Sequence, residues 1–200
     1  MVKNMNKEKS ELEKAIEFSG YLCPRVVFGV RASELGLERL GAQKLGDDEI
    51  VAIVENVSCM VDGIQSASGC TLGKGNLVVK NYGKMAVTFI NQETRDAFRL
   101  MVKRKVLEDL QNSDLVKAKD EGRLPQEEIT KMAEEVSQQM MELPGEELFD
   151  IKKVHIEAPT FKRILDSVRC TICGEYFGEE FGRDKDGKIV CIPCFEGDGR

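Results

Sequence analysis

The chain has 200 residues, 42% of them hydrophobic and 32% charged, which is the composition of a globular protein and not of a disordered one. Its net charge of −6 disfavours a large nucleic-acid footprint, which requires clustered Lys and Arg. The sequence has no membrane-length apolar stretch and no apolar leader after Met1. We therefore expect a cytoplasmic protein that does not span a membrane.

The first half of the chain is expected to combine three helices with three strands, because amphipathic and β-branched stretches follow one another at short intervals. Gly20 ends the first helix, and Pro24 suits the first turn of the second. The expected helices are residues 6–18, 24–41 and 61–68. The expected strands are residues 49–55, 77–80 and 85–90. Asn81-Tyr82-Gly83 is a turn-forming triplet, so the last two strands are predicted to form a hairpin.

The second half is richer in charge and is expected to be mostly helical as far as Leu143. One helix is predicted over residues 95–110, and Pro125 opens another that places two glutamates in its first turn. Residues 149–156 favour a last strand. The layout predicts an α+β fold with a mostly antiparallel sheet over residues 1–160, followed by a small treble-clef or zinc-ribbon module over residues 161–200.

The C-terminal module carries the most specific motif in the sequence, two Cys-x-x-Cys pairs. Four thiolates at this spacing are typical of a tetrahedral zinc site, and a reducing cytoplasm favours metal over disulfides. Because four protein ligands close the coordination shell, the zinc is expected to be structural. The expected ligands are Cys170, Cys173, Cys191 and Cys194.

Residues 69–76 form a glycine-rich segment that resembles a phosphate loop but departs from it. The spacing between the glycines is too short, and a glycine follows Lys74 where the Walker pattern needs Ser or Thr. Lys74 and Asn76 could still offer an ammonium and backbone amides to an anionic ligand, while an ordinary tight turn is the simpler interpretation.

Three further cysteines are scattered over the first half. Cys23 precedes a proline at a helix start, where backbone amides stabilise a thiolate. Cys59 lies three residues before Asp62, and Cys70 precedes the glycine-rich segment. These positions fit either a thiol site or three buried inert cysteines, and spacing alone leaves both open. His155, the single histidine, is expected to be solvated or packed and not part of a site.

Three segments together resemble the FmdE family, which takes its name from formylmethanofuran dehydrogenase. They are Phe18-Ser19-Gly20-Tyr21-Leu22-Cys23-Pro24, Cys59-Met60-Val61-Asp62-Gly63-Ile64-Gln65 and Gly69-Cys70-Thr71-Leu72-Gly73-Lys74-Gly75-Asn76. Lys80-Asn81-Tyr82-Gly83-Lys84 extends the likeness, which covers roughly residues 10–155. The resemblance implies a homodimeric α+β domain, with its cysteines gathered at one site, associated with a molybdenum or tungsten enzyme of one-carbon metabolism.

The resemblance assigns the site to Cys23, Cys59, Asp62 and Cys70, with Lys74 and Asn76 nearby. Relatives typically carry His-Gly-His before Leu-Cys-Pro, whereas this chain has Ser19-Gly20-Tyr21. The family's histidine ligands are therefore absent here. Three thiolates could still hold a soft ion such as zinc, as a second metal with one open position.

We expect these three sulfurs to converge on one pocket, in a metal- or redox-linked accessory protein of formylmethanofuran dehydrogenase-type metabolism. Such a protein could form a homodimer and dock on a larger oxidoreductase; whether it is itself catalytic stays open. The alternative is a zinc-dependent adaptor or transcriptional regulator with a ligand-sensing N-terminal domain.

Overall fold

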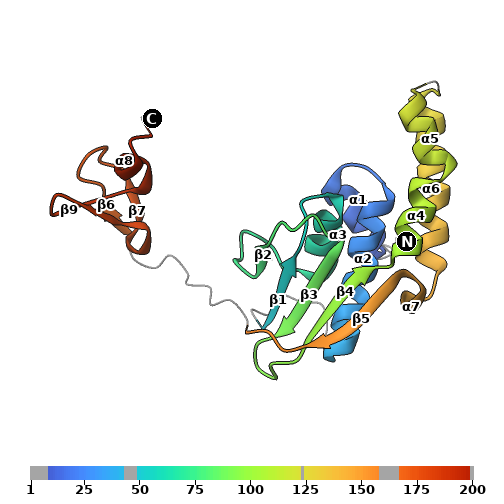
Figure 1. Cartoon of the computed structure of the whole chain (residues 1–200), viewed down its shortest axis with the longest axis horizontal. Coiled ribbons are helices and arrows are strands. Elements are labelled where there is room, and N and C mark those ends of the chain that lie inside the picture. Colours follow the sequence, from blue (N-terminus) through green and yellow to red (C-terminus); the bar gives the residue numbers. More distant parts are fainter. Residues whose placement is uncertain (1–8, 43–48, 123, 158–166, 199–200) are drawn as a thin grey trace, which may run out of the picture. The chain divides into compact units, whose positions relative to one another are not determined.

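The structure, a computed structural model, describes residues 9–42, 49–122, 124–157 and 167–198. The chain divides into two compact units, Met1–Pro159 and Thr160–Arg200 (Figure 1). Within the described ranges, no helix is both long enough and apolar enough to cross a membrane.

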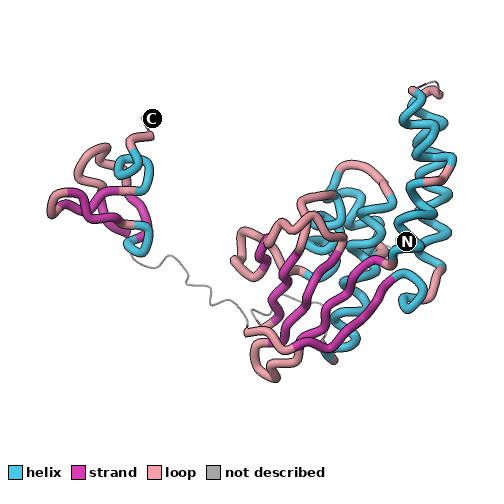
Figure 2. Tube along the Cα trace, viewed as in Figure 1, coloured by secondary structure: helices cyan, strands magenta, loops and turns pink. Residues whose placement is uncertain are grey.

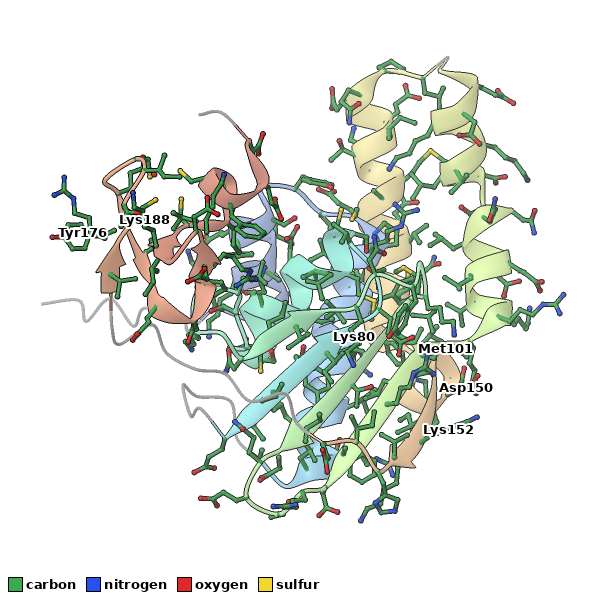
Figure 3. All side chains as sticks on the ribbon, turned by 60° about the vertical axis from the view of Figure 1, so that its left-hand side comes forward. Lys80, Met101, Asp150, Lys152, Tyr176 and Lys188 are labelled. Carbon is green, nitrogen blue, oxygen red and sulfur yellow. The ribbon has the colours of Figure 1, made fainter. Side chains whose placement is uncertain are left out.

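The first unit is built on a five-stranded sheet of order β2-β1-β3-β4-β5. Its strands are β1 (Ile50–Val54), β2 (Leu77–Val79), β3 (Ala86–Asn91), β4 (Ala97–Val102) and β5 (Phe149–Val154). All neighbouring pairs are antiparallel except β1 and β2, which run parallel. Met101 of β4 and Asp150 of β5 are such antiparallel partners (Figure 3). The expected α+β class with a mostly antiparallel sheet is confirmed.

Three helices near the N-terminus pack against one another beside this sheet (Figure 2). They are α1 (Glu11–Ser19), α2 (Pro24–Leu40) and α3 (Cys59–Ser68). The main core lies between these helices and the sheet, and its centre holds Phe28 of α2, Phe89 of β3 and Phe149 of β5, all fully buried. A side chain at Gly36 would overlap the Phe89 ring, with a Cβ only 2.2 Å from Cδ2, so this glycine lets α2 lie close on the sheet.

The remaining helices of the first unit form an arm beside β4 and β5 (Figure 1). They are α4 (Arg104–Gln111), α5 (Asp114–Glu121), α6 (Gln126–Glu142) and α7 (Gly145–Leu148). Leu115 of α5 and Ile129 and Ala133 of α6 form a small core of their own. The helix expected to open at Pro125 is confirmed, because α6 begins directly after this residue.

The helix predicted over residues 95–110 is wrong in its first half, which forms strand β4 before α4 begins. Phe98, Met101 and Val102 fit helical spacing, but Phe98, Leu100 and Val102 fit strand alternation equally well. Leu100 and Val102 are buried in the main core, and β4 pairs with both β3 and β5. Tertiary pairing therefore decides between two patterns that the same residues satisfy.

The predicted hairpin of residues 77–80 and 85–90 is also wrong, because β1 lies between its two strands. Helix α3 carries the chain from β1 to β2, which pairs with β1 in parallel. The backbone N–H groups of Tyr82 and Lys84 then donate to the Glu55 carbonyl, at 2.9 Å and 3.0 Å. The turn triplet therefore crosses the end of β1 and places β3 on its other edge.

The second unit is a small module of short strands and one terminal helix. Its elements are β6 (Ser167–Arg169), β7 (Tyr176–Gly178), a 3-10 helix (Glu179–Phe181), β8 (Arg183–Lys185), β9 (Lys188–Val190) and α8 (Ile192–Glu196). Strands β6 and β7 form one antiparallel hairpin around the first Cys-x-x-Cys pair, and β8 and β9 form another. Helix α8 begins directly after Cys191 and contains Cys194. This arrangement fits the expected zinc module.

Candidate functional site

Helices α2 and α3 touch backbone to backbone at two glycines. A Cβ at Gly29 would lie 2.2 Å from the Met60 carbonyl oxygen, and one at Gly63 would lie 2.3 Å from the Val26 carbonyl oxygen. Real Cβ atoms do not approach other atoms this closely, so only glycine permits the crossing. The crossing lies within two turns of the start of each helix and brings the two N-termini together.

One cysteine stands at each of these N-termini. Cys23 caps α2, and Cys59 is the first residue of α3, after its N-cap Ser58. The Cys23 side chain is buried with Ala15 of α1 and other small apolar residues, and the half-buried Cys59 packs against the same cluster. The structure therefore brings these two predicted site residues together.

Two side chains from the segment between α1 and α2 complete the site. The Tyr21 hydroxyl lies 2.6 Å from Cys59 Sγ, and the Ser19 hydroxyl donates to Asp62 Oδ2 at 3.0 Å. Gly20 lies between them with φ 84°, a left-handed conformation that turns the chain so that both neighbours contact α3. Sequence reasoning missed Ser19 and Tyr21, because it treated this triplet only as a loss of histidines.

The site keeps its buried thiol and its phenol protonated at neutral pH. Burial raises the pKa of Cys23, the Val26 N–H in the first turn of α2 offsets part of that rise, and neighbouring Cys59 adds to it. The hydrogen bond with Cys59, followed by repulsion from its sulfur, raises the pKa of Tyr21 to about 12. Tyr21 can therefore act as a hydrogen-bond donor to the Cys59 sulfur.

Cys70 does not join this site, so the prediction that three sulfurs converge is wrong. Cys70 follows the C-terminus of α3, whereas Cys59 begins it, and the ends of a ten-residue helix lie about 15 Å apart. Cys70 is buried, and its thiol donates to the Ile50 carbonyl at 3.4 Å. Burial raises its pKa, partly offset by the Ser68 hydroxyl. A metal held by all three core thiolates is incompatible with this placement.

Lys74 and Asn76 also lie at the far end of α3, where they hold the glycine-rich turn together. Lys74 Nζ donates to the Gly69 carbonyl at 2.9 Å. The buried Asn76 side chain accepts from the Thr71 N–H at 2.9 Å and donates to the Ile50 carbonyl at 3.2 Å. The structure supports the tight-turn interpretation and does not place these residues with Cys23 and Cys59. His155 is exposed just after β5, away from the site.

The second unit contains a separate cluster of sulfur atoms (Figure 3). The ligand atoms of Cys170, Cys173, Cys191 and Cys194 all lie within 4.8 Å of one another. Across the described residues, this is the one group of three or more Cys, His, Asp or Glu side chains placed to hold a metal ion. Gly174, with φ 80°, makes the turn that follows the first pair.

Backbone N–H groups point at this cluster and favour a thiolate. Burial opposes ionisation of Cys170, but the N–H groups of Cys191, Cys173 and Ile172 lower its pKa to about 6. Burial and the neighbouring thiols raise the pKa of Cys194 to about 12. Four thiols this close therefore cannot all ionise unless a cation neutralises them, which suits a metal centre.

Comparison with known proteins agrees with both units. The family model described as "FmdE, Molybdenum formylmethanofuran dehydrogenase operon" matches residues 18–150. A probable S-adenosyl-L-methionine-binding protein of Archaeoglobus fulgidus is 34% identical over 197 residues. That match covers 92% of this chain and 52% of the relative, so the chain spans about half of the relative's length. The crystal structure of an FmdE-like protein of the tungsten formylmethanofuran dehydrogenase type from Syntrophus aciditrophicus shares the fold, with TM-score 0.65, 22% identity and 96% of each chain covered.

Proposed function

Because the chain belongs to the FmdE family, we propose that Cys23 and Cys59 form a redox-active thiol pair that serves a formylmethanofuran dehydrogenase-type oxidoreductase as an accessory. The observation that carries the proposal is the packing of both cysteines into one cluster at facing helix N-termini, with Tyr21 on the Cys59 sulfur. The operon named in the family description supports this class of partner.

The chemistry would follow thiol–disulfide exchange. Cys59, the more exposed thiol, attacks a small disulfide, forms a mixed disulfide and expels one thiolate. Cys23 then attacks the Cys59 sulfur and expels the second thiolate, and the two protons pass to the two leaving groups. The products are one protein disulfide and two small thiols. The Tyr21 hydroxyl stabilises the attacking sulfur by hydrogen bonding.

The proposal is tested by incubating the metal-loaded full chain with glutathione disulfide and mapping its disulfides by mass spectrometry. A Cys23–Cys59 linkage that dithiothreitol reverses is expected. Cys23→Ser should stop at glutathionylated Cys59, because the second thiol is gone. Cys70→Ser is the matched control and should form the linkage normally, since Cys70 lies at the other end of α3. Failure of the intact chain to form the linkage, while Cys59 becomes glutathionylated, would contradict the proposal.

The four-cysteine cluster would hold a structural zinc ion. With Zn–S bonds of about 2.3 Å, the sulfurs of a tetrahedral site lie about 3.8 Å apart. Cys173 Sγ and Cys191 Sγ are separated by 3.8 Å. The Cys191 N–H also donates to Cys170 Sγ at 3.4 Å, a contact that stabilises a ligating thiolate. Four protein ligands leave no open position, so the ion would stabilise the module without taking part in catalysis.

Metal analysis of the purified full chain tests this assignment. One zinc per chain is expected, and Cys173→Ser should lower the zinc content while Cys70→Ser leaves it unchanged. A different metal, or no metal in chain purified without chelators, would overturn the assignment. Two zinc ions per chain would instead indicate metal at the Cys23–Cys59 pair and argue against its redox role.

A further inference from the structure

A cavity of about 490 Å³ opens between the start of α2 and the helices α4 and α5. Its volume lies within the range of small-molecule sites, about 300–1,000 Å³. The fully or nearly buried residues among its lining are Cys23, Pro24, Phe28 and Leu115. The half-buried residues are Met85, Leu107, Leu110 and Val116. Seven of these eight carry no ionisable group, so most of the lining suits an apolar molecule.

Charge is confined to the exposed residues of the lining. These are Arg25, Lys119 and Asp120, together with the uncharged Gln111. Within the described part of the chain, neither Arg25 nor Lys119 has an ion-pair partner. Arg25 also stands in the first turn of α2, where the helix dipole is positive. The rim therefore carries two cations against one anion and favours a negatively charged group.

We propose that this cavity binds an amphipathic monocarboxylate of the medium-chain fatty acid class, with its alkyl chain against the apolar lining and its carboxylate between Arg25 and Lys119. The apolar lining disfavours sugars and nucleotides, whose polar groups would lose water without finding partners. The single anion at the rim, Asp120, is outnumbered and does not favour a cationic amphiphile. A neutral alcohol would occupy the same space without using the two cations.

Calorimetric titration of the full chain with hexanoate, octanoate and decanoate tests the proposal, at concentrations below those at which each forms micelles. Saturable binding at one site per chain is expected, and each added methylene should strengthen it about fourfold until the cavity is filled. Decanol and decylamine test the head group and should bind more weakly than decanoate.

Variants locate the site. Arg25→Gln and Lys119→Gln should each weaken decanoate binding by about threefold to fivefold, as expected for an exposed ion pair, and leave decanol binding unchanged. Lys117→Gln is the matched control, because this α5 lysine pairs with Asp114 and does not line the cavity. Val116→Phe should block binding by filling the cavity, whereas Val57→Phe adds the same volume at an exposed position and should not. Decanoate should also protect Cys23, but not Cys70, from alkylation by N-ethylmaleimide.

Three results would overturn the proposal: no saturable binding, equal affinity for decanoate and decylamine, or unchanged affinity in the Arg25→Gln, Lys119→Gln double variant. A dimer in sedimentation that must dissociate before decanoate binds would show that a second copy covers the cavity, and would also overturn it. The test is independent of the thiol pair, because Cys23→Ala removes the disulfide chemistry and should leave decanoate binding in place.

Discussion

Tyr21 is the residue whose substitution tests most directly how the thiol pair is activated. Its hydroxyl, 2.6 Å from Cys59 Sγ, donates to that sulfur when the thiol loses its proton. Tyr21→Phe removes the donor and keeps the ring. Alkylation of Cys59 by iodoacetamide at neutral pH should slow about threefold to tenfold. Tyr82→Phe, at another exposed tyrosine, should leave the rate unchanged; equal slowing in both variants would contradict a specific role for Tyr21.

Glu55 and Arg99 form the best-shielded ion pair of the first unit. Arg99 Nε and Nη2 donate to the two Glu55 carboxylate oxygens at 2.6 Å and 2.8 Å. These bonds lower the pKa of Glu55 below its ordinary value of 4.5, more than burial raises it. The stabilisation is therefore complete above that ordinary value and is lost as the pH falls through the lower pKa of the folded state.

Glu55→Gln should accordingly lower the free energy of unfolding at neutral pH by about 1–3 kcal/mol. Urea unfolding at decreasing pH should show the difference from the unsubstituted chain shrinking below the ordinary carboxyl pKa. Glu108→Gln is the control, because the Arg104–Glu108 pair is exposed and should contribute less than about 1 kcal/mol. A difference that stays constant as the pH falls would refute the role of the Glu55 charge.

The glycine crossing of α2 and α3 gives the prediction that belongs to the scale of elements. Gly63→Ala would place a Cβ 2.3 Å from the Val26 carbonyl oxygen, so the helices must separate. Unfolding in urea should show a loss of about 1–3 kcal/mol or more. Gly73→Ala is the matched control, because a Cβ there meets nothing within 4 Å. If both variants unfold alike, the crossing is not close-packed as described.

Elements defined by local signals were predictable from the sequence, and elements defined by distant partners were not. Gly20 and Gly41 end α1 and α2 in left-handed conformations, as helix-terminating glycines do. By contrast, β2 borders β1 because α3 carries the chain back in parallel, and no residue of the Asn81-Tyr82-Gly83 triplet encodes that pairing. The stretch that became β4 satisfied two periodicities at once.

The candidate sites follow the same division. The four C-terminal cysteines lie within one short module, so their spacing alone predicts that they gather. Bringing Cys23 and Cys59 together depends on the crossing of two helices. Cys70 was assigned to the same site from family resemblance, but the length of α3 carries it away. Asp62 was predicted correctly as a neighbour of Cys59, yet its partner Ser19 comes from another helix.

At the scale of the whole molecule, metal removal should affect the two units differently. The buried core of the second unit consists of Cys170, Val190 and Cys191, too few residues to hold its short strands without metal. Chelation of the full chain should abolish hydrogen-exchange protection over residues 167–198 and leave the sheet of the first unit protected. Cys173→Ser should reproduce this loss without chelator. Protection that survives complete metal removal would contradict a metal-dependent fold.

The bare contact between Gly29 and Gly63 also limits how the molecule can report a change at its sulfurs. Helices whose main chains already touch have no room to slide or tilt closer, so a bond formed between Cys23 and Cys59 would be absorbed by side-chain rotation alone. The sheet and the arm would then keep one shape in both oxidation states. Any protein that distinguishes those states must read the mouth of the thiol site itself, through Tyr21 and the exposed edge of Cys59.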